Sequence, residues 1–171
     1  MTEQKTEDRP LEKEFAGLID ALELPALQKR FMHSRWLDQL LWMEGRAGKA
    51  QRRYYILRLT AIVGGVIVPA LVGLDRFQGL TVVISLIVAV SVAVEEFFHF
   101  GERWRHYRRT VEVLKMEGWQ FFQLSGGYQN FATHAGGYPE FAARVEDCLG
   151  REVDVFIAEI AREKKARRQD D

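Results

Sequence analysis

The chain has 171 residues with 24 basic and 24 acidic side chains, so its formal net charge of zero points to no particular class of partner. Its single cysteine, Cys148, excludes an intrachain disulfide and a cysteine-based metal cluster. More than half of the chain is polar, and its most apolar residues gather in two stretches near the middle.

The N-terminal part, residues 1–25, is predicted to be flexible, with one short amphipathic helix. Residues 1–10 are acidic and polar without an apolar core, so we expect them to be disordered and to hold no signal peptide. Apolar residues then recur at helical spacing from Leu11 to Leu22, before Pro25. A second helical pattern covers residues 26–55 and predicts a cytosolic, juxtamembrane helix.

Two apolar stretches predict transmembrane helices over residues 56–74 and 80–98. The first is about 19 residues long, or roughly 28 Å as a helix, which matches the hydrocarbon core of a bilayer. The second reaches spanning length only if its helix continues through Glu95 and Glu96. The connector Asp75–Gly79 is too short for a domain, so the two helices must form an antiparallel hairpin. The alternative is a soluble hairpin inside a large core, but a chain of this length rarely buries two such helices.

The polar sequence after the hairpin continues the helical pattern. No stop signal follows Glu96, so residues 99–124 are predicted to extend the second span into the cytosol as one long helix. Residues 125–139 contain two Gly-Gly pairs and read as a loop, and residues 140–171 as an amphipathic helix with a charged tail. The predicted fold is all-α: a transmembrane hairpin on a cytosolic helical bundle, assembled as a homo-oligomer.

Basic residues predict the orientation of this hairpin. They precede the first span and follow the second, whereas the connector holds only Arg76 beside Asp75. The positive-inside rule therefore places both termini in the cytoplasm. The clustered arginines after the second span are expected to determine the membrane topology and to bind lipid headgroups rather than nucleic acid. An aromatic belt is expected at the cytoplasmic interface, made of Tyr54, Tyr55, Phe97, Phe98, Phe100 and Trp104.

Each span carries a periodic stripe. In the first, small residues four apart predict a helix-packing seam, with a kink at the proline: Ala61, Gly65, Pro69 and Gly73. In the second, a partly polar stripe either packs against other helices or lines water: Gln78, Thr81, Ser85, Ala89, Val92 and Glu96. One hairpin cannot enclose water, but several copies around an axis could.

The paired carboxylates Glu95 and Glu96 are the strongest candidates for function, because charges at the end of a span are costly unless they are paired or hydrated. Reflecting the chain about Phe77 places Arg58 opposite Glu96, which suggests a salt bridge. One arginine cannot neutralise both acids. Our hypothesis is that Glu95 pairs with Arg58 and that Glu96 forms a ring that selects cations in an oligomer.

Several runs of residues resemble the SLATT family of small bacterial two-span membrane proteins, which overlaps a group of unknown function. These runs are Arg35–Gln39 and Arg52–Tyr55 before the hairpin, Trp104–Glu117 after it, and Phe141–Glu146. The resemblance covers about residues 30–150 and implies a channel-like pore in the bacterial inner membrane. The resemblance also implies a role in bacterial conflict systems, although no fused sensor domain is recognisable here.

The sequence thus leads to a homo-oligomeric inner-membrane cation channel lined by the second span. The alternatives are a poorly selective pore of a defence system and a non-conducting anchor or scaffold. We expect no enzyme activity, cofactor, metal site or nucleic-acid partner. The expected partners are membrane lipids, monovalent cations and further copies of the chain, and an unidentified cytosolic regulator is left open.

Overall fold

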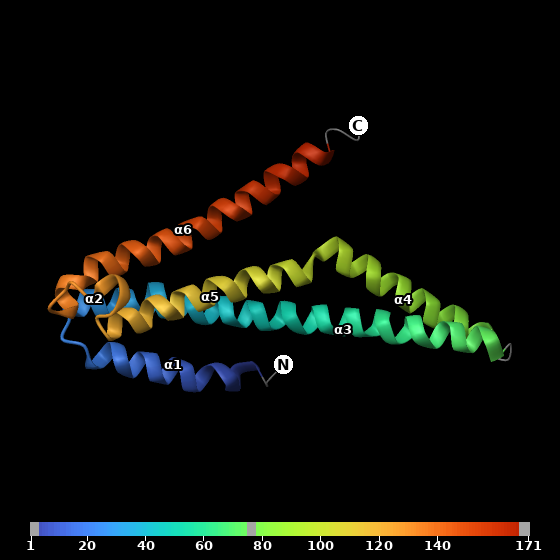
Figure 1. The fold of residues 1–171 in the computed structure, drawn as a ribbon, viewed down its shortest axis with the longest axis horizontal. Helices are drawn as coiled ribbons and strands as arrows, with labels where there is room; N and C mark the ends of the chain where they lie inside the picture. Colours follow the sequence, from blue (N-terminus) through green and yellow to red (C-terminus); the bar gives the residue numbers. More distant parts are fainter. Residues whose placement is uncertain (1–3, 75–77, 168–171) are drawn as a thin grey trace. The chain divides into compact units, whose positions relative to one another are not determined.

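A computed structural model describes residues 4–74 and 78–167, with side chains over residues 10–74 and 78–151. Within these residues every element is helical and no strand is present, which confirms the all-α prediction. The elements shown in Figure 1 are α1 (Gln4–Ala21), α2 (Ala26–Phe31), the π-helical η1 (Met32–Leu37), α3 (Asp38–Leu74), α4 (Gln78–Phe98), α5 (Phe100–Phe122), the 3-10 helix η2 (Gly126–Tyr128) and α6 (His134–Arg167).

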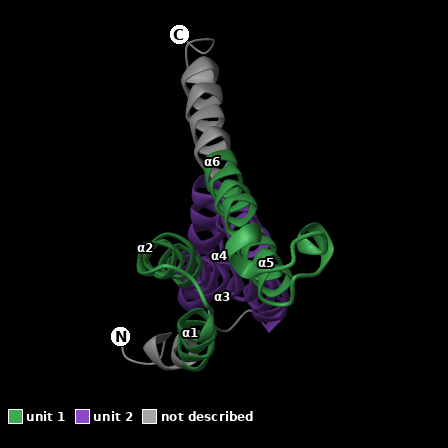
Figure 2. Ribbon diagram, turned by 90° about the vertical axis from the view of Figure 1, so that its left-hand side faces the viewer, with its two compact units in different colours: residues 1–42, 110–171 green, residues 43–109 purple. Residues whose placement is uncertain are grey.

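The helices form two compact units, coloured separately in Figure 2. One unit combines residues 1–42 with residues 110–171, and the other contains residues 43–109. Helices α3 and α5 each contribute to both units. The second unit contains the apolar part of α3 and all of α4, together with the polar residues that flank them.

Aromatic side chains build the core of the first unit. Trp36 is fully buried, with its ring 5.1 Å from that of Phe15 and 5.8 Å from that of Phe141. Phe141 in turn stacks on Phe121, with ring centroids 4.5 Å apart. Burying such large apolar side chains is the main favourable term in folding, so this cluster holds α1, η1, α5 and α6 together.

The hairpin of the second unit packs α3 against α4 with little buried surface. Both helices are long and apolar enough to span a membrane, and only 6% of the most apolar window of each is buried. At the contact, Gly64 lies against Val88, whose Cγ2 atom would overlap any Cβ at position 64. Most of the large apolar side chains of α3 and α4 therefore face outward from the single chain.

Three expected boundaries differ from the structure. Helix α1 begins at Gln4, so residues 4–10 are helical rather than disordered, since Gln, Lys, Glu and Arg all favour helices; residues 1–3 lie outside the described part. Helix α4 begins at Gln78, so the connector is shorter than expected. Helix α6 begins at His134 because Thr133 caps it, its Oγ1 accepting a hydrogen bond from the N–H of Gly136 at 3.2 Å.

The long helix expected over residues 80–124 is broken at one residue. His99 adopts a left-handed conformation with φ of +50°, between the end of α4 and the start of α5, and Figure 1 shows the chain bending there. The prediction of a continuous helix was therefore wrong. Apolar residues keep their helical spacing across the break, so periodicity carried no sign of it.

Candidate functional site

The break at His99 contributes to a candidate site at the end of the hairpin that lies away from its connector. The His99 N–H still donates to the carbonyl oxygen of Glu95, and its own carbonyl accepts from the N–H groups of Glu102 and Arg103. Histidine tolerates left-handed backbone better than most residues with a Cβ. The break brings Gly101 against the ring of Tyr54, where a Cβ would lie 2.8 Å from Cε2.

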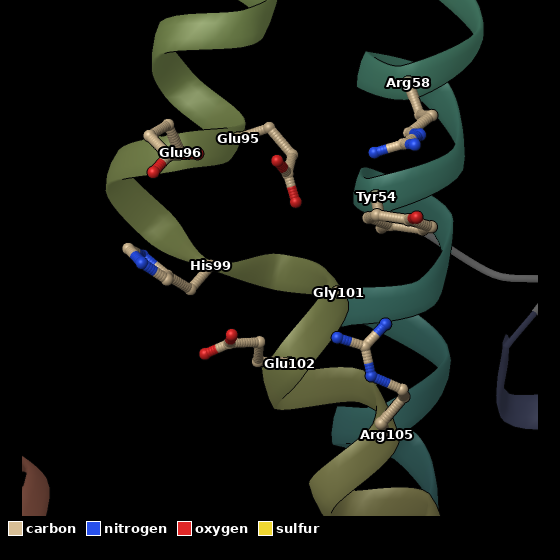
Figure 3. A pocket seen from close by; sticks show the side chains of 8 residues that line it. All are labelled: Tyr54, Arg58, Glu95, Glu96, His99, Gly101, Glu102 and Arg105. Carbon is tan, nitrogen blue, oxygen red and sulfur yellow. The ribbon is translucent and has the colours of Figure 1, made fainter.

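A pocket opens between α3 and the α4–α5 junction, and Figure 3 shows its lining. Two residues come from α3, two from the end of α4, and the rest from the break and the first turns of α5. The lining residues are Tyr54, Arg58, Glu95, Glu96, His99, Gly101, Glu102 and Arg105. Most of them are charged, so the pocket suits a polar or ionic ligand rather than an apolar one.

The two neighbouring carboxylates point in different directions. Glu95 is half-buried and turned toward α3, while Glu96 is exposed and points away from α3 (Figure 3). The register is also shifted from the expected one. Gly64 and Val88 are equidistant from sequence position 76, so Arg58 lies opposite Val94, next to Glu95, rather than opposite Glu96. The centre of the reflection is position 76 rather than 77, because α4 starts earlier than expected. The residue opposite Arg58 therefore shifts by two positions.

The charges of this pocket do not neutralise one another directly. Among the described residues, no salt bridge joins Arg58 or Arg105 to Glu95, Glu96 or Glu102. The Arg58 guanidinium instead lies over the ring of Tyr54, 5.9 Å from its centroid. The expected salt bridge between Arg58 and a glutamate is therefore absent, although Figure 3 shows Arg58 and Glu95 turned toward each other.

Aromatic side chains gather around the same end of the hairpin. Tyr55 and Trp104 have ring centroids 5.7 Å apart, and Tyr54 lies beside both. At the α4–α5 junction, Phe98 at the end of α4 stacks on Phe100 at the start of α5, with ring centroids 5.3 Å apart. Tyr and Trp prefer the level of lipid headgroups, where one end of the side chain is apolar and the other is hydrated. All six residues of the expected aromatic belt thus lie near the α4–α5 junction.

The stripe proposed to line a pore is divided between two environments. Thr81 and Ser85 are half-buried, and Ser85 Oγ donates to the carbonyl oxygen of Thr81 at 2.8 Å. The other four stripe residues are exposed in the single chain: Gln78, Ala89, Val92 and Glu96. The stripe therefore flanks the α3 contact and leaves one open face on α4.

The expected packing seam of the first span lies beside the observed one. Ala61 is half-buried, but Gly65, Pro69 and Gly73 are exposed, and a Cβ at Gly65 or Gly73 would meet nothing within 4 Å. The small residue at the α3–α4 contact is Gly64. Each step of four residues turns about 40° further than one full turn of the helix. Successive residues of such a ridge therefore move around the helix and away from a straight contact with α4. These three residues do not form the seam within one chain.

Sequence reasoning missed the role of five lining residues, one of which is Gly101. Tyr54 was assigned only to an aromatic belt, Arg105 only to topology, and His99 and Glu102 to a continuous helix. The reflection that paired the two spans, extended by one turn, would have placed Tyr54 near Gly101. No group of three or more His, Cys, Asp or Glu side chains in the described part of the chain is arranged to hold a metal ion.

Comparison with known proteins identifies a family but no activity. Neither the curated proteins nor the solved structures contain a match to the chain. One family model, described as a protein of unknown function (DUF4231), matches residues 38–136, which is more than half of the chain and includes α3, α4 and α5. The resemblance to the SLATT family stays a prediction. The chain belongs to the DUF4231 family of proteins of unknown function.

Proposed function

We propose that the chain is a homo-oligomeric cation channel of the bacterial inner membrane, with α4 lining its pore. One observation carries the proposal: of two adjacent carboxylates at the end of an apolar helix, Glu95 faces α3 and Glu96 faces outward. A carboxylate exposed beside apolar side chains is stable only where water or a cation reaches it. Copies arranged around an axis would give Glu96 that water.

Membrane insertion follows from the exposed apolar surface of the hairpin. Large side chains such as Val66, Leu59 and Leu86 are more than 60% exposed, which water would make very costly but lipid tails would not. Basic residues cluster at the end that carries Arg53 and Arg103, so both termini lie in the cytoplasm.

The open face of α4 would form the wall of the pore. Ala89 and Val92 are exposed on this face, about two turns and one turn before Glu96, and would line that part of the passage with apolar side chains. The Ser85 hydroxyl donates its proton to Thr81, so its oxygen lone pairs remain available to a hydrated cation. A ring of Glu96 carboxylates at the cytoplasmic mouth would attract cations and repel anions.

The test is ion flux into liposomes that hold the purified chain, measured for sodium, potassium and chloride. The variant Glu96→Gln removes the ring charge, and Glu95→Gln removes the same charge from the neighbouring position that faces α3. We expect cation-selective flux in the wild type, reduced cation preference in Glu96→Gln and retained preference in Glu95→Gln. Equal permeation of chloride would instead fit a poorly selective pore, and no flux with any ion would fit an anchor or scaffold.

A further inference from the structure

The pocket at the α4–α5 junction holds charges of both signs on opposite sides. Arg58 projects from α3 and Arg105 from α5, while Glu95 projects from α4 and Glu102 from the first turn of α5 (Figure 3). No salt bridge within the described residues joins these cations to these anions. Separated, unneutralised charges of both signs match a ligand that itself carries both.

The position of the pocket narrows the class of ligand. It opens where the apolar helices end, and Tyr54, Tyr55 and Trp104 cluster at the same level. Aromatic side chains of this kind mark the headgroup region of a bilayer. If the hairpin is inserted as proposed above, the molecules that surround the pocket at the highest concentration are phospholipid headgroups.

We propose that this pocket binds the headgroup of a zwitterionic phospholipid that carries a primary amine, namely phosphatidylethanolamine. The lipid phosphate lies against the guanidinium groups of Arg58 and Arg105, which suit phosphate oxygens through paired N–H donors. The lipid ammonium lies against the carboxylates of Glu95 and Glu102. The inference rests on membrane insertion but not on ion conduction.

Choline and glycerol lipids each carry the phosphate but lack the primary ammonium group that the pocket carboxylates would bind. A choline headgroup has the same net charge, but its quaternary nitrogen has no N–H to donate to a carboxylate. A glycerol headgroup leaves the lipid anionic, and the carboxylates that line the pocket outnumber its arginines. Ethanolamine lipid should therefore bind more tightly than either, by about tenfold for each charge-assisted hydrogen bond that is lost.

The experiment measures lipid retention on the purified full chain in detergent by native mass spectrometry. Phosphatidylethanolamine, phosphatidylcholine and phosphatidylglycerol with identical acyl chains are titrated separately, together with soluble phosphoethanolamine. We expect retention of the ethanolamine lipid at about tenfold lower concentration than the choline lipid. Equal retention of these two lipids, or tighter retention of phosphatidylglycerol, would overturn the proposal. Binding of soluble phosphoethanolamine as tight as that of the lipid would overturn the assignment to a lipid.

Two variants locate the site. Arg105→Gln and Glu102→Gln each remove one pocket charge, and we expect each to lose most of the preference for the ethanolamine lipid. Arg103→Gln is the matched control, because Arg103 is an exposed arginine on the same helix that does not line the pocket. Equal losses in Arg103→Gln and Arg105→Gln would contradict the proposed location. None of these three residues belongs to the proposed pore, so selective lipid binding without ion flux would reject the channel and keep the lipid site.

Discussion

The indole ring of Trp36 lies directly against the backbone of Gly118, closer than any Cβ would permit. One turn earlier on the same helix, the carbonyl oxygen of Leu114 accepts a hydrogen bond from Trp36 Nε1 at 3.1 Å. Gly118 in α5 therefore provides the space that lets the side chain of Trp36 reach from η1 into the centre of the first unit. Because π-helical turns are uncommon, this one marks a place where packing determines the backbone.

Replacing Gly118 with alanine should destabilise the first unit. The new methyl group would overlap the Trp36 ring, and overpacking of this kind typically costs about 1–3 kcal/mol. The readout is labelling of the buried Cys148 by a thiol reagent during denaturant titration, because this cysteine belongs to the same unit. Gly17→Ala is the control, since a Cβ there meets nothing within 4 Å. Unchanged Cys148 protection in Gly118→Ala would show that the ring does not need this space.

Adjacent glycines of the hairpin should respond in opposite ways. Gly64→Ala places a methyl group against Val88 and should force α3 and α4 apart, whereas Gly65→Ala points into open space. We expect only Gly64→Ala to lower the concentration of sodium dodecyl sulfate that disrupts the purified protein, by an amount equivalent to about 1–3 kcal/mol. If Gly65→Ala alone weakens the protein and reduces its oligomeric size, Gly65 packs between copies, as the predicted ridge requires.

The two spans were predictable because hydropathy depends on the sum over many residues and tolerates local errors. The break at His99 was not, because neither glycine nor proline occupies the position and the apolar spacing continues on both sides. Similarly, the Gly-Gly pair at Gly136 and Gly137 suggested a loop, but the hydroxyl of Thr133 caps the start of α6 there. Such short-range backbone choices depend on tertiary contacts that one sequence does not reveal.

The candidate site was predictable only in part, because its composition can be read from the sequence but its backbone geometry cannot. Glu95, Glu96 and Arg58 stood out because charges are rare at the ends of apolar helices. Their true register depended on where α4 begins, a difference that moved Arg58 from Glu96 to the neighbourhood of Glu95. The contribution of Glu102 and Arg105 depended on the bend at His99, so it could not be found by extending a straight helix.

The first unit should lose stability in acid, because protonation of Glu146 removes its ion pair with Arg35. Arg35 donates two hydrogen bonds to the Glu146 carboxylate, at 2.7 and 2.8 Å, and the nearby guanidinium lowers the pKa of that carboxyl. The pair therefore stabilises the fold above the unfolded pKa of Glu146, and this contribution is lost as the pH falls through the folded pKa. Both side chains are nearly half exposed, so we expect about 0.2–1 kcal/mol.

A double-mutant cycle on Arg35→Gln and Glu146→Gln measures this contribution by denaturant unfolding, followed by helical circular dichroism, at neutral pH and at about pH 3. We expect a favourable coupling energy at neutral pH that disappears in acid. A coupling energy that stays constant across this range would mean that the hydrogen bonds do not depend on ionised Glu146.

The buried phenol of Tyr128 should matter more for stability than the phenol of Tyr138. Tyr128 is fully buried and its hydroxyl donates to Glu117 Oε2 at 2.8 Å, and burial is the main cause of its raised pKa. Tyr128→Phe removes that donor from a largely buried carboxylate, at an expected cost of about 1.5–3 kcal/mol. Tyr138→Phe deletes the same atom from a half-buried ring that, within the described residues, makes no side-chain hydrogen bond, so we expect little change. Equal loss of Cys148 protection in both variants would show that the hydroxyl of Tyr128 contributes only through packing. Glu117 keeps its ion pair with Arg144 at 3.6 Å in Tyr128→Phe, so partial rescue by Glu117→Gln would confirm that the loss of the tyrosine donor to this carboxylate carries the cost.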